Sequence, residues 1–171
     1  ADAVNHISIS GAQEKLSAVI KNKKICLTQA DEHGRYIIKP APGDERLRFR
    51  RQMPANEHLT MQIAKQVYKI KTAESAIAFF VDDKITYITK RFDYNTDGTK
   101  IAQEDFASLA GKTENSHGKD FKYTGSYEDA AALLRRYVVA WKVEIVNYFT
   151  LIIFNYLFGN GDAHLKNFSL Q

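Results

Sequence analysis

The stretch that decides the fold is GNGDAHLKNFSL, residues 159–170, near the end of a chain of 171 residues. A carboxylate, Asp162, is followed five positions later by a carboxamide, Asn167, in a Gly-rich loop that comes after an apolar helical run. This spacing is typical of phosphoryl-transfer loops, in which the carboxylate orients an attacking hydroxyl and the amide oxygen binds a metal ion. Because Asp and Asn are also ordinary turn residues, the pattern needs support from the rest of the chain.

The composition is that of a globular protein, with 44% apolar and 26% charged residues. A net charge of +4 and a sequence pI near 9.0 permit an anionic ligand or an acidic partner. The single cysteine, Cys26, excludes a disulfide within the chain, and the five histidines are not spaced as ligands of a structural zinc ion. With no signal peptide pattern and an apolar run, residues 151–158, too short to cross a bilayer, we expect a cytoplasmic protein without a membrane segment.

The basic residues are scattered except in RLRFRR, residues 46–51. Two interpretations remain open for this segment: a patch for nucleic acid or an acidic partner, and a solvated, mobile loop.

The front half predicts β structure with one helix. Alternating or apolar runs bounded by turn residues predict strands over residues 6–10, 16–20, 25–28 and 36–39, which we expect to form an antiparallel meander. Pro54 is suited to the first turn of a helix that reaches about Tyr68, with Leu59, Ile63 and Val67 as its buried stripe. Residues 75–81 and 85–90 then flank Asp82 and Asp83 as a hairpin.

The back half predicts helices. They cover residues 104–110, a segment that starts at the capping pattern Ser126 to Asp129, and residues 142–157, with a polar loop over 111–125. The fold class is therefore α+β, and the two halves meet near residues 91–103.

A lysine and a glutamate in the front half have the spacing of a phosphate-binding pair. Lys39 ends the run YIIK, and Glu57 follows eighteen residues later in the first turn of the next helix. In kinase-like folds such a lysine contacts the nucleotide phosphates while the helix glutamate holds its amine in place. The alternative is a surface lysine at a strand end and a glutamate favoured at a helix N-terminus by the helix dipole.

Six segments occur in the order and approximate spacing of one known family. They are SISGAQEKLS, IIKP, PANE, ITKRFD, QEDFA and GNGDAHLKNFS. Together they resemble the HipA-like serine/threonine kinases, the toxins of bacterial toxin–antitoxin systems, and the S-I-S loop is similar to that of the shorter HipT-like members. The resemblance spans nearly the whole chain and implies a two-lobed, protein-kinase-like fold, with a β-rich lobe over residues 1–91 and part of a helical lobe over 92–171.

The resemblance also implies site residues and cofactors, which are ATP and Mg²⁺. Asp162 is similar to the catalytic aspartate and Asn167 to a magnesium ligand. Ser8 and Ser10 match positions of regulatory autophosphorylation, and Lys39 matches the phosphate-binding lysine, with Glu57 as its candidate partner. The remaining nucleotide-binding candidates are Gly11, Ala12, Gln13 and Lys15 of the first loop, Lys90 and Phe92 of the hinge, Gln103 and His164.

For the complete protein, the resemblance implies a HipB-like DNA-binding antitoxin as partner, with DNA association only through that antitoxin. It also implies a protein substrate, of the kind of an aminoacyl-tRNA synthetase. The chain begins with Ala and stops at Gln171 in a strand-like pattern, before the second metal-binding aspartate of such kinases. We therefore expect a truncated chain that is inactive alone.

Two other functions share these features. Small-molecule phosphotransferases of the aminoglycoside and choline type carry a similar G-D-x-H-x-x-N loop, and a chain of this length can also act as a non-catalytic fragment that binds an antitoxin.

Overall fold

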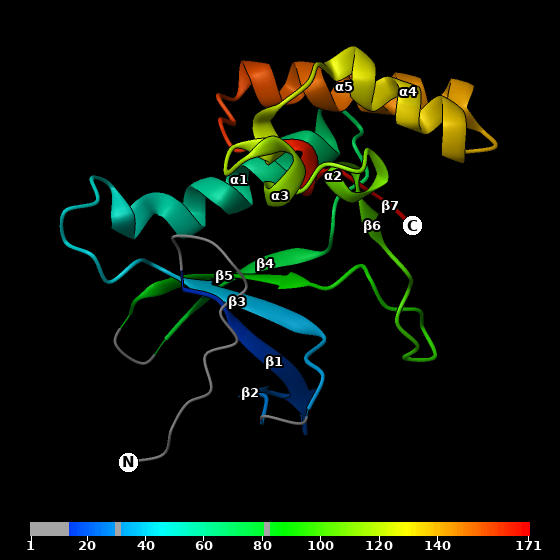
Figure 1. Cartoon of the computed structure of the whole chain (residues 1–171). Helices are drawn as coiled ribbons and strands as arrows, with labels where there is room; N and C mark the ends of the chain where they lie inside the picture. Colours follow the sequence, from blue (N-terminus) through cyan, green and yellow to red (C-terminus); the bar gives the residue numbers. More distant parts are fainter. Residues whose placement is uncertain (1–13, 30–31, 81–82) are drawn as a thin grey trace. The chain divides into compact units, whose positions relative to one another are not determined.

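The structure, a computed structural model, describes residues 14–29, 32–80 and 83–171 (Figure 1). The chain forms two compact units, residues 1–97 and 98–171, and each is described by itself. The strand expected over residues 6–10 lies outside the described residues. Within the described ranges, no helix combines the length and apolar character that a membrane span requires.

The first unit contains a five-stranded antiparallel sheet. Its strands are β1 (Leu16–Lys21), β2 (Lys24–Leu27), β3 (Tyr36–Pro40), β4 (Ser75–Phe79) and β5 (Ile85–Lys90), in the order β2-β1-β3-β5-β4. The predicted strands of the described range are present, and β4 and β5 pair as the expected hairpin.

The expected meander is wrong, because β1 lies between β2 and β3. The turn Asn22–Lys23, with φ of 51° and 63°, folds β2 back along one edge of β1. The chain then returns past β1 at Gly34, where an added Cβ would lie 1.9 Å from Ser17 Oγ. This close approach requires glycine, and it brings β3 to the other edge of β1.

Helix α1 (Met53–Gln66) follows the short helix η1 (Arg50–Gln52) and lies along the sheet (Figure 1). Pro54 is in its first turn, as the sequence indicates, and its side chain is buried. The expected buried stripe is wrong, because Leu59 and Val67 are 57% and 65% exposed, whereas Ala64 is buried. A small side chain on the inner face lets the helix approach the sheet closely.

The two faces of the sheet are buried differently. Ala18, Ile38 and Ile88 form a buried apolar cluster on one face. Tyr87 is adjacent to Ile88 in β5, so its side chain lies on the opposite face of the sheet. It is 2% exposed, and its ring centroid lies 6.3 Å from that of His58 in α1. Because Lys39 is the register partner of Tyr87, its side chain lies on the face that α1 covers.

The second unit is mostly helical. Its elements are β6 (Glu104–Asp105), α2 (Phe106–Leu109), α3 (Glu114–His117), η2 (Phe121–Tyr123), α4 (Tyr127–Tyr137), α5 (Trp141–Leu157), η3 (Leu165–Asn167) and β7 (Ser169–Leu170). The predicted cap of α4 is confirmed, since Ser126 Oγ accepts from Asp129 N at 3.1 Å and Asp129 Oδ2 accepts from Ser126 N at 2.9 Å.

Two expectations for this unit are wrong. The helix predicted from Glu104 starts at Phe106, because Asp105 caps it by accepting from Ser108 N, and Glu104 pairs with Leu170 as strand. The segment predicted as a polar loop, residues 111–125, contains α3 and η2. A capping box between Thr113 and Ser116 explains α3.

The buried core of the second unit includes a residue of the 159–170 loop. Phe106, Ala130, Leu134, Tyr148 and Phe168 form one buried cluster, and α4 and α5 pack side by side (Figure 1). Phe168 follows Asn167 directly, and its ring lies 5.4 Å from that of Tyr148. The end of the loop is therefore anchored in this core.

Candidate active-site loop and lysine pair

The loop begins at a defined helix end. Gly159 has φ of 64°, and its N–H donates to the carbonyl of Tyr156, while Asn160 N donates to the carbonyl of Asn155 at 2.8 Å. This pair of bonds is a Schellman motif, which ends α5 and sets the direction of the chain that follows. Asn160 Oδ1 then accepts from Asp162 N at 3.2 Å, so the Asn160 side chain holds the turn that carries the carboxylate.

The loop closes on Asp162. The Asn167 side-chain amide donates to the main-chain carbonyl of Asp162 at 2.5 Å and to its Oδ2 at 3.1 Å. Asn167 N donates to the carbonyl of His164 at 2.8 Å. The two residues singled out by their five-residue spacing are therefore in direct contact, and the Asp162 side chain stays 75% exposed.

His164 lies beside this carboxylate. Its Nε2 is 3.4 Å from Asp162 Oδ1, and its side chain is only 8% exposed. The Tyr123 ring packs edge-on against the imidazole at 5.1 Å between centroids. With an Nε2–H tautomer, His164 presents a donor toward the carboxylate.

Gln103 is tied to the far end of the same loop. Its Nε2 donates to Ser169 Oγ at 2.6 Å, next to the β6–β7 pairing of Asp105 with Ser169. A side chain from 66 positions upstream thus reaches the loop end.

In the first unit, Lys39 Nζ forms an ion pair with Glu57 Oε1. The two side chains are 20% and 30% exposed, and the ammonium also lies 5.5 Å from the centroid of the Tyr87 ring. Burial raises the pKa of Tyr87, so its phenol remains neutral beside the pair. Strand β3 and helix α1 thus hold a partly buried ammonium with one carboxylate partner.

The remaining candidates of the first unit are dispersed. Lys90 ends β5 and contacts Glu74 at 3.1 Å between Nζ and Oε2, and Phe92 is 61% exposed. Lys15 is partly buried just before β1. Ser8, Ser10, Gly11, Ala12 and Gln13 lie outside the described residues.

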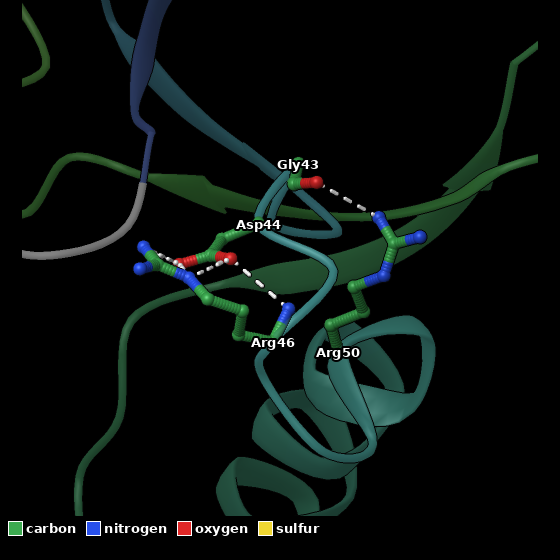
Figure 2. Close-up of polar contacts among 4 residues, drawn as sticks. All are labelled: Gly43, Asp44, Arg46 and Arg50. Atoms are coloured by element: carbon green, nitrogen blue, oxygen red, sulfur yellow. Dashed lines mark hydrogen bonds and ion pairs between the residues drawn. The ribbon is translucent and has the colours of Figure 1, made fainter.

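Two arginines of the segment 46–51 contact neighbouring residues of the same connection. Figure 2 shows the Arg46 guanidinium folded onto Asp44, with 2.8 Å between Arg46 Nη2 and Asp44 Oδ2. Arg50 donates to the carbonyls of Pro42 and Gly43 at 3.2 and 3.0 Å and pairs with Glu45. Two of its arginines therefore stabilise the connection between β3 and α1.

The loop offers oxygen atoms of the kind that Mg²⁺ binds. Both side-chain hydrogen bonds of Asn167 donate from Nδ2 to oxygen atoms of Asp162, so its amide oxygen points away from these acceptors, and the Asp162 carboxylate is exposed. Mg²⁺ takes few protein ligands and completes its shell with phosphates and water. Over the described ranges, no group of three or more His, Cys, Asp or Glu side chains converges on a metal position.

Three residues that hold or contact the 159–170 loop were not identified from the sequence. Tyr123 and Tyr148 carry no motif and reach the loop only through packing. Asn160 had a signal in the Asn-Gly-Asp run, because Asn is a common first residue of side-chain-capped turns.

Residues 7–171 match the family described as HipA-like C-terminal domain. The chain belongs to this family. It is 31% identical over 170 residues to a Haemophilus influenzae protein named "Putative kinase", and 28% identical over 178 residues to "Putative kinase Y4mE" of Sinorhizobium fredii. These matches cover 95% and 96% of the chain but 47% and 38% of the relatives.

Among solved structures, the fold matches a chain in the complex of HipA, HipB and operator DNA from the toxin–antitoxin system of Shewanella oneidensis MR-1. The TM-score is 0.64 at 25% identity, and the match covers 98% of this chain and 41% of that chain. The resemblance inferred from the motifs and the α+β, HipA-kinase-like fold are confirmed. The chain spans less than half the length of each of these three proteins.

Proposed function

We propose that this chain carries the phosphate-binding lysine and the catalytic loop of an ATP-dependent serine/threonine protein kinase of the HipA toxin type. The observation that carries the proposal is the loop itself, in which an exposed Asp162 carboxylate is held by Asn167 and His164. Membership of the HipA-like family and the names of the two relatives support it.

In the proposed reaction, Asp162 orients the hydroxyl of a substrate serine and accepts its proton. The serine oxygen forms a bond to the γ-phosphorus as the bond to the leaving oxygen of ADP breaks. Lys39 binds the phosphates, and Glu57 keeps its ammonium in place. Asn167 would hold Mg²⁺ through its amide oxygen, and the ion would neutralise charge on the phosphates.

Substrate, partner and regulation extend the same proposal. The solved relative is complexed with HipB and operator DNA, which favours a HipB-like antitoxin as the partner of the complete protein. The substrate is a protein, and phosphorylation at Ser8 or Ser10 switches the kinase off.

The test is Asp162→Asn in the full-length protein that carries this chain. We expect autophosphorylation to fall by at least about a hundredfold, because loss of a group of this class removes proton acceptance and orientation. Exposed Asp120→Asn serves as a matched control for the loss of one surface charge. Full activity of the Asp162 variant would contradict the assignment, and transfer to a sugar or aminoglycoside in place of a serine peptide would favour a small-molecule phosphotransferase.

A further inference from the structure

The Lys39 ammonium contacts an aromatic ring as well as a carboxylate. Its Nζ lies over the ring of Tyr87, 5.5 Å from the centroid, and also pairs with Glu57. A cation in this position is attracted by the negative charge on the face of the ring, and the attraction is stronger where water is excluded. Tyr87 is 2% exposed and the Lys39 side chain 20% exposed, so water is largely excluded from this contact.

The sheet itself brings the two side chains together. Lys39 in β3 and Tyr87 in β5 are directly opposite each other in the antiparallel register. Opposite residues in such a pair have side chains on the same face, with Cβ atoms about 4.5 to 5.5 Å apart. The position of the ring beside the lysine is therefore fixed by strand pairing.

The ring is also held at its other contacts. It packs at 56° against the imidazole of His58, which follows Glu57 directly in α1, with 6.3 Å between the centroids. The phenol hydroxyl forms hydrogen bonds with the side chains of Ser75 in β4 and Thr89 in β5. Contacts with the helix and with two strands therefore keep the ring in one orientation under the ammonium.

An aromatic face suits a lysine that must still bind an anion. The ammonium has three N–H donors, and Glu57 accepts from it. A second carboxylate in place of the ring would compete with a phosphate for the remaining donors and would cancel the positive charge. An aliphatic side chain would leave a partly buried charge with less compensation. The ring attracts the charge and leaves donors for the phosphate.

We propose that Tyr87 is a positioning residue for Lys39. Its ring face and the Glu57 carboxylate together hold the ammonium where the nucleotide phosphates bind, and Tyr87 acts through the lysine without touching the nucleotide. This inference rests on the proposed function, because it takes Lys39 as the phosphate-binding residue. The competing explanation is that Tyr87 only fills the space between the sheet and α1.

The experiment is graded fluorination of the ring at position 87 in the full-length protein that carries this chain. Tyr87→Phe is the reference, followed by 4-fluoro-, 3,5-difluoro- and 3,4,5-trifluorophenylalanine at the same position. Fluorine withdraws charge from the ring face and changes the shape of the ring little, so a space-filling role should not follow the series. We expect kcat/KM for ATP to fall stepwise, by about threefold to tenfold from Phe to the trifluoro ring.

The same series at Phe79, which lies on β4 and is 68% exposed, should leave kcat/KM unchanged. If kcat/KM at position 87 does not follow the number of fluorine atoms, while Lys39→Met lowers it strongly, the positioning role is wrong.

A second measurement needs no catalysis. Denaturant unfolding of this chain is compared across the position 87 series, with Lys39 present and with Lys39→Met. With Lys39, the unfolding equilibrium constant should rise about twofold to fivefold from Phe to the trifluoro ring, and with Lys39→Met this rise should disappear. An equal rise in both backgrounds would overturn the proposal. If Lys39→Met leaves phosphoryl transfer intact, the proposed function fails, and the unfolding series still decides whether the ring holds the ammonium.

Discussion

Lys39 and Asp162, the two charged groups assigned to the reaction, are held in different ways. Lys39 pairs with a residue 18 positions away, and both side chains are less than one-third exposed between strand and helix. Asp162 contacts residues two and five positions away and remains 75% exposed. The lysine is held by tertiary packing, and the aspartate by a local loop.

The difference matches the chemistry proposed for each group. A partly buried ammonium is costly without a counter-charge, so its orientation depends on Glu57 and on the sheet beneath it. A proton acceptor for an incoming hydroxyl must be accessible, and loop hydrogen bonds can orient it without covering it. The Asp162 carboxylate can therefore be held by its own loop and still be exposed, whereas the Lys39 ammonium is held by side chains that partly bury it.

Substitutions in the buried core of each unit should have the largest effect and test whether Lys39 and Asp162 are held independently. Ile38→Ala, at 3% exposure in the sheet cluster, and Leu134→Ala, at 4% in the helical cluster, should each cost about 2 to 5 kcal/mol. Hydrogen exchange should show the loss of protection mainly in the unit that carries the substitution. Equal loss in both units for either variant would show that lysine and loop depend on one common core.

The ion pair itself gives the next largest effect. In the full-length protein, Lys39→Met should lower phosphoryl transfer about a hundredfold, equivalent to about 2.7 kcal/mol, because the phosphates lose a direct contact. Glu57→Gln should cost about tenfold, since Lys39 remains but loses its charged partner. Lys65→Met, exposed on the same helix, is the control. A larger loss for Glu57→Gln than for Lys39→Met would reverse the assigned roles.

The same contrast explains what the sequence could predict. The contact of Asp162 with Asn167 follows from a spacing of five within one turn of loop, so the pattern itself carries the geometry. The order β2-β1-β3 could not be read from alternation, because alternation defines strands but not which edge each one joins. Leu59 and Val67 were wrongly predicted to be buried. The helical period shows which residues share one face of the helix, but packing against the sheet decides which face is buried, and here it is the face that carries Ala64. The contacts of Tyr123 and Tyr148 with the loop depend on side chains from separate helices, which no local pattern brings together.

The turn into the loop gives a smaller effect with a matched control. Gly159→Ala places a side chain at φ of 64° and should destabilise the chain by about 1 to 2 kcal/mol, although an added Cβ would meet no atom within 4 Å. Gly161→Ala also adds a Cβ in open space, where the backbone is not left-handed, and should cost less. Thermal unfolding of the two variants measures the difference. Equal stabilities would show that the left-handed conformation of Gly159 in the Schellman motif is not required for the folded loop.

The smallest effect concerns the tyrosine that anchors the loop end. The pKa of Tyr148 is raised to about 12 in the folded chain, against 10.0 ordinarily, chiefly by burial. Between pH 10 and 12 the unfolded chain releases this proton while the folded chain keeps it, so stability present below pH 10 is lost as the pH rises. Tyr148→Phe should make the decline of stability over this range shallower, and Tyr156→Phe, which is 82% exposed, should leave it unchanged. Denaturant unfolding at pH 9 and pH 11 measures this slope, and an equal decline in the Tyr148 variant would show that folding does not raise the pKa of this phenol.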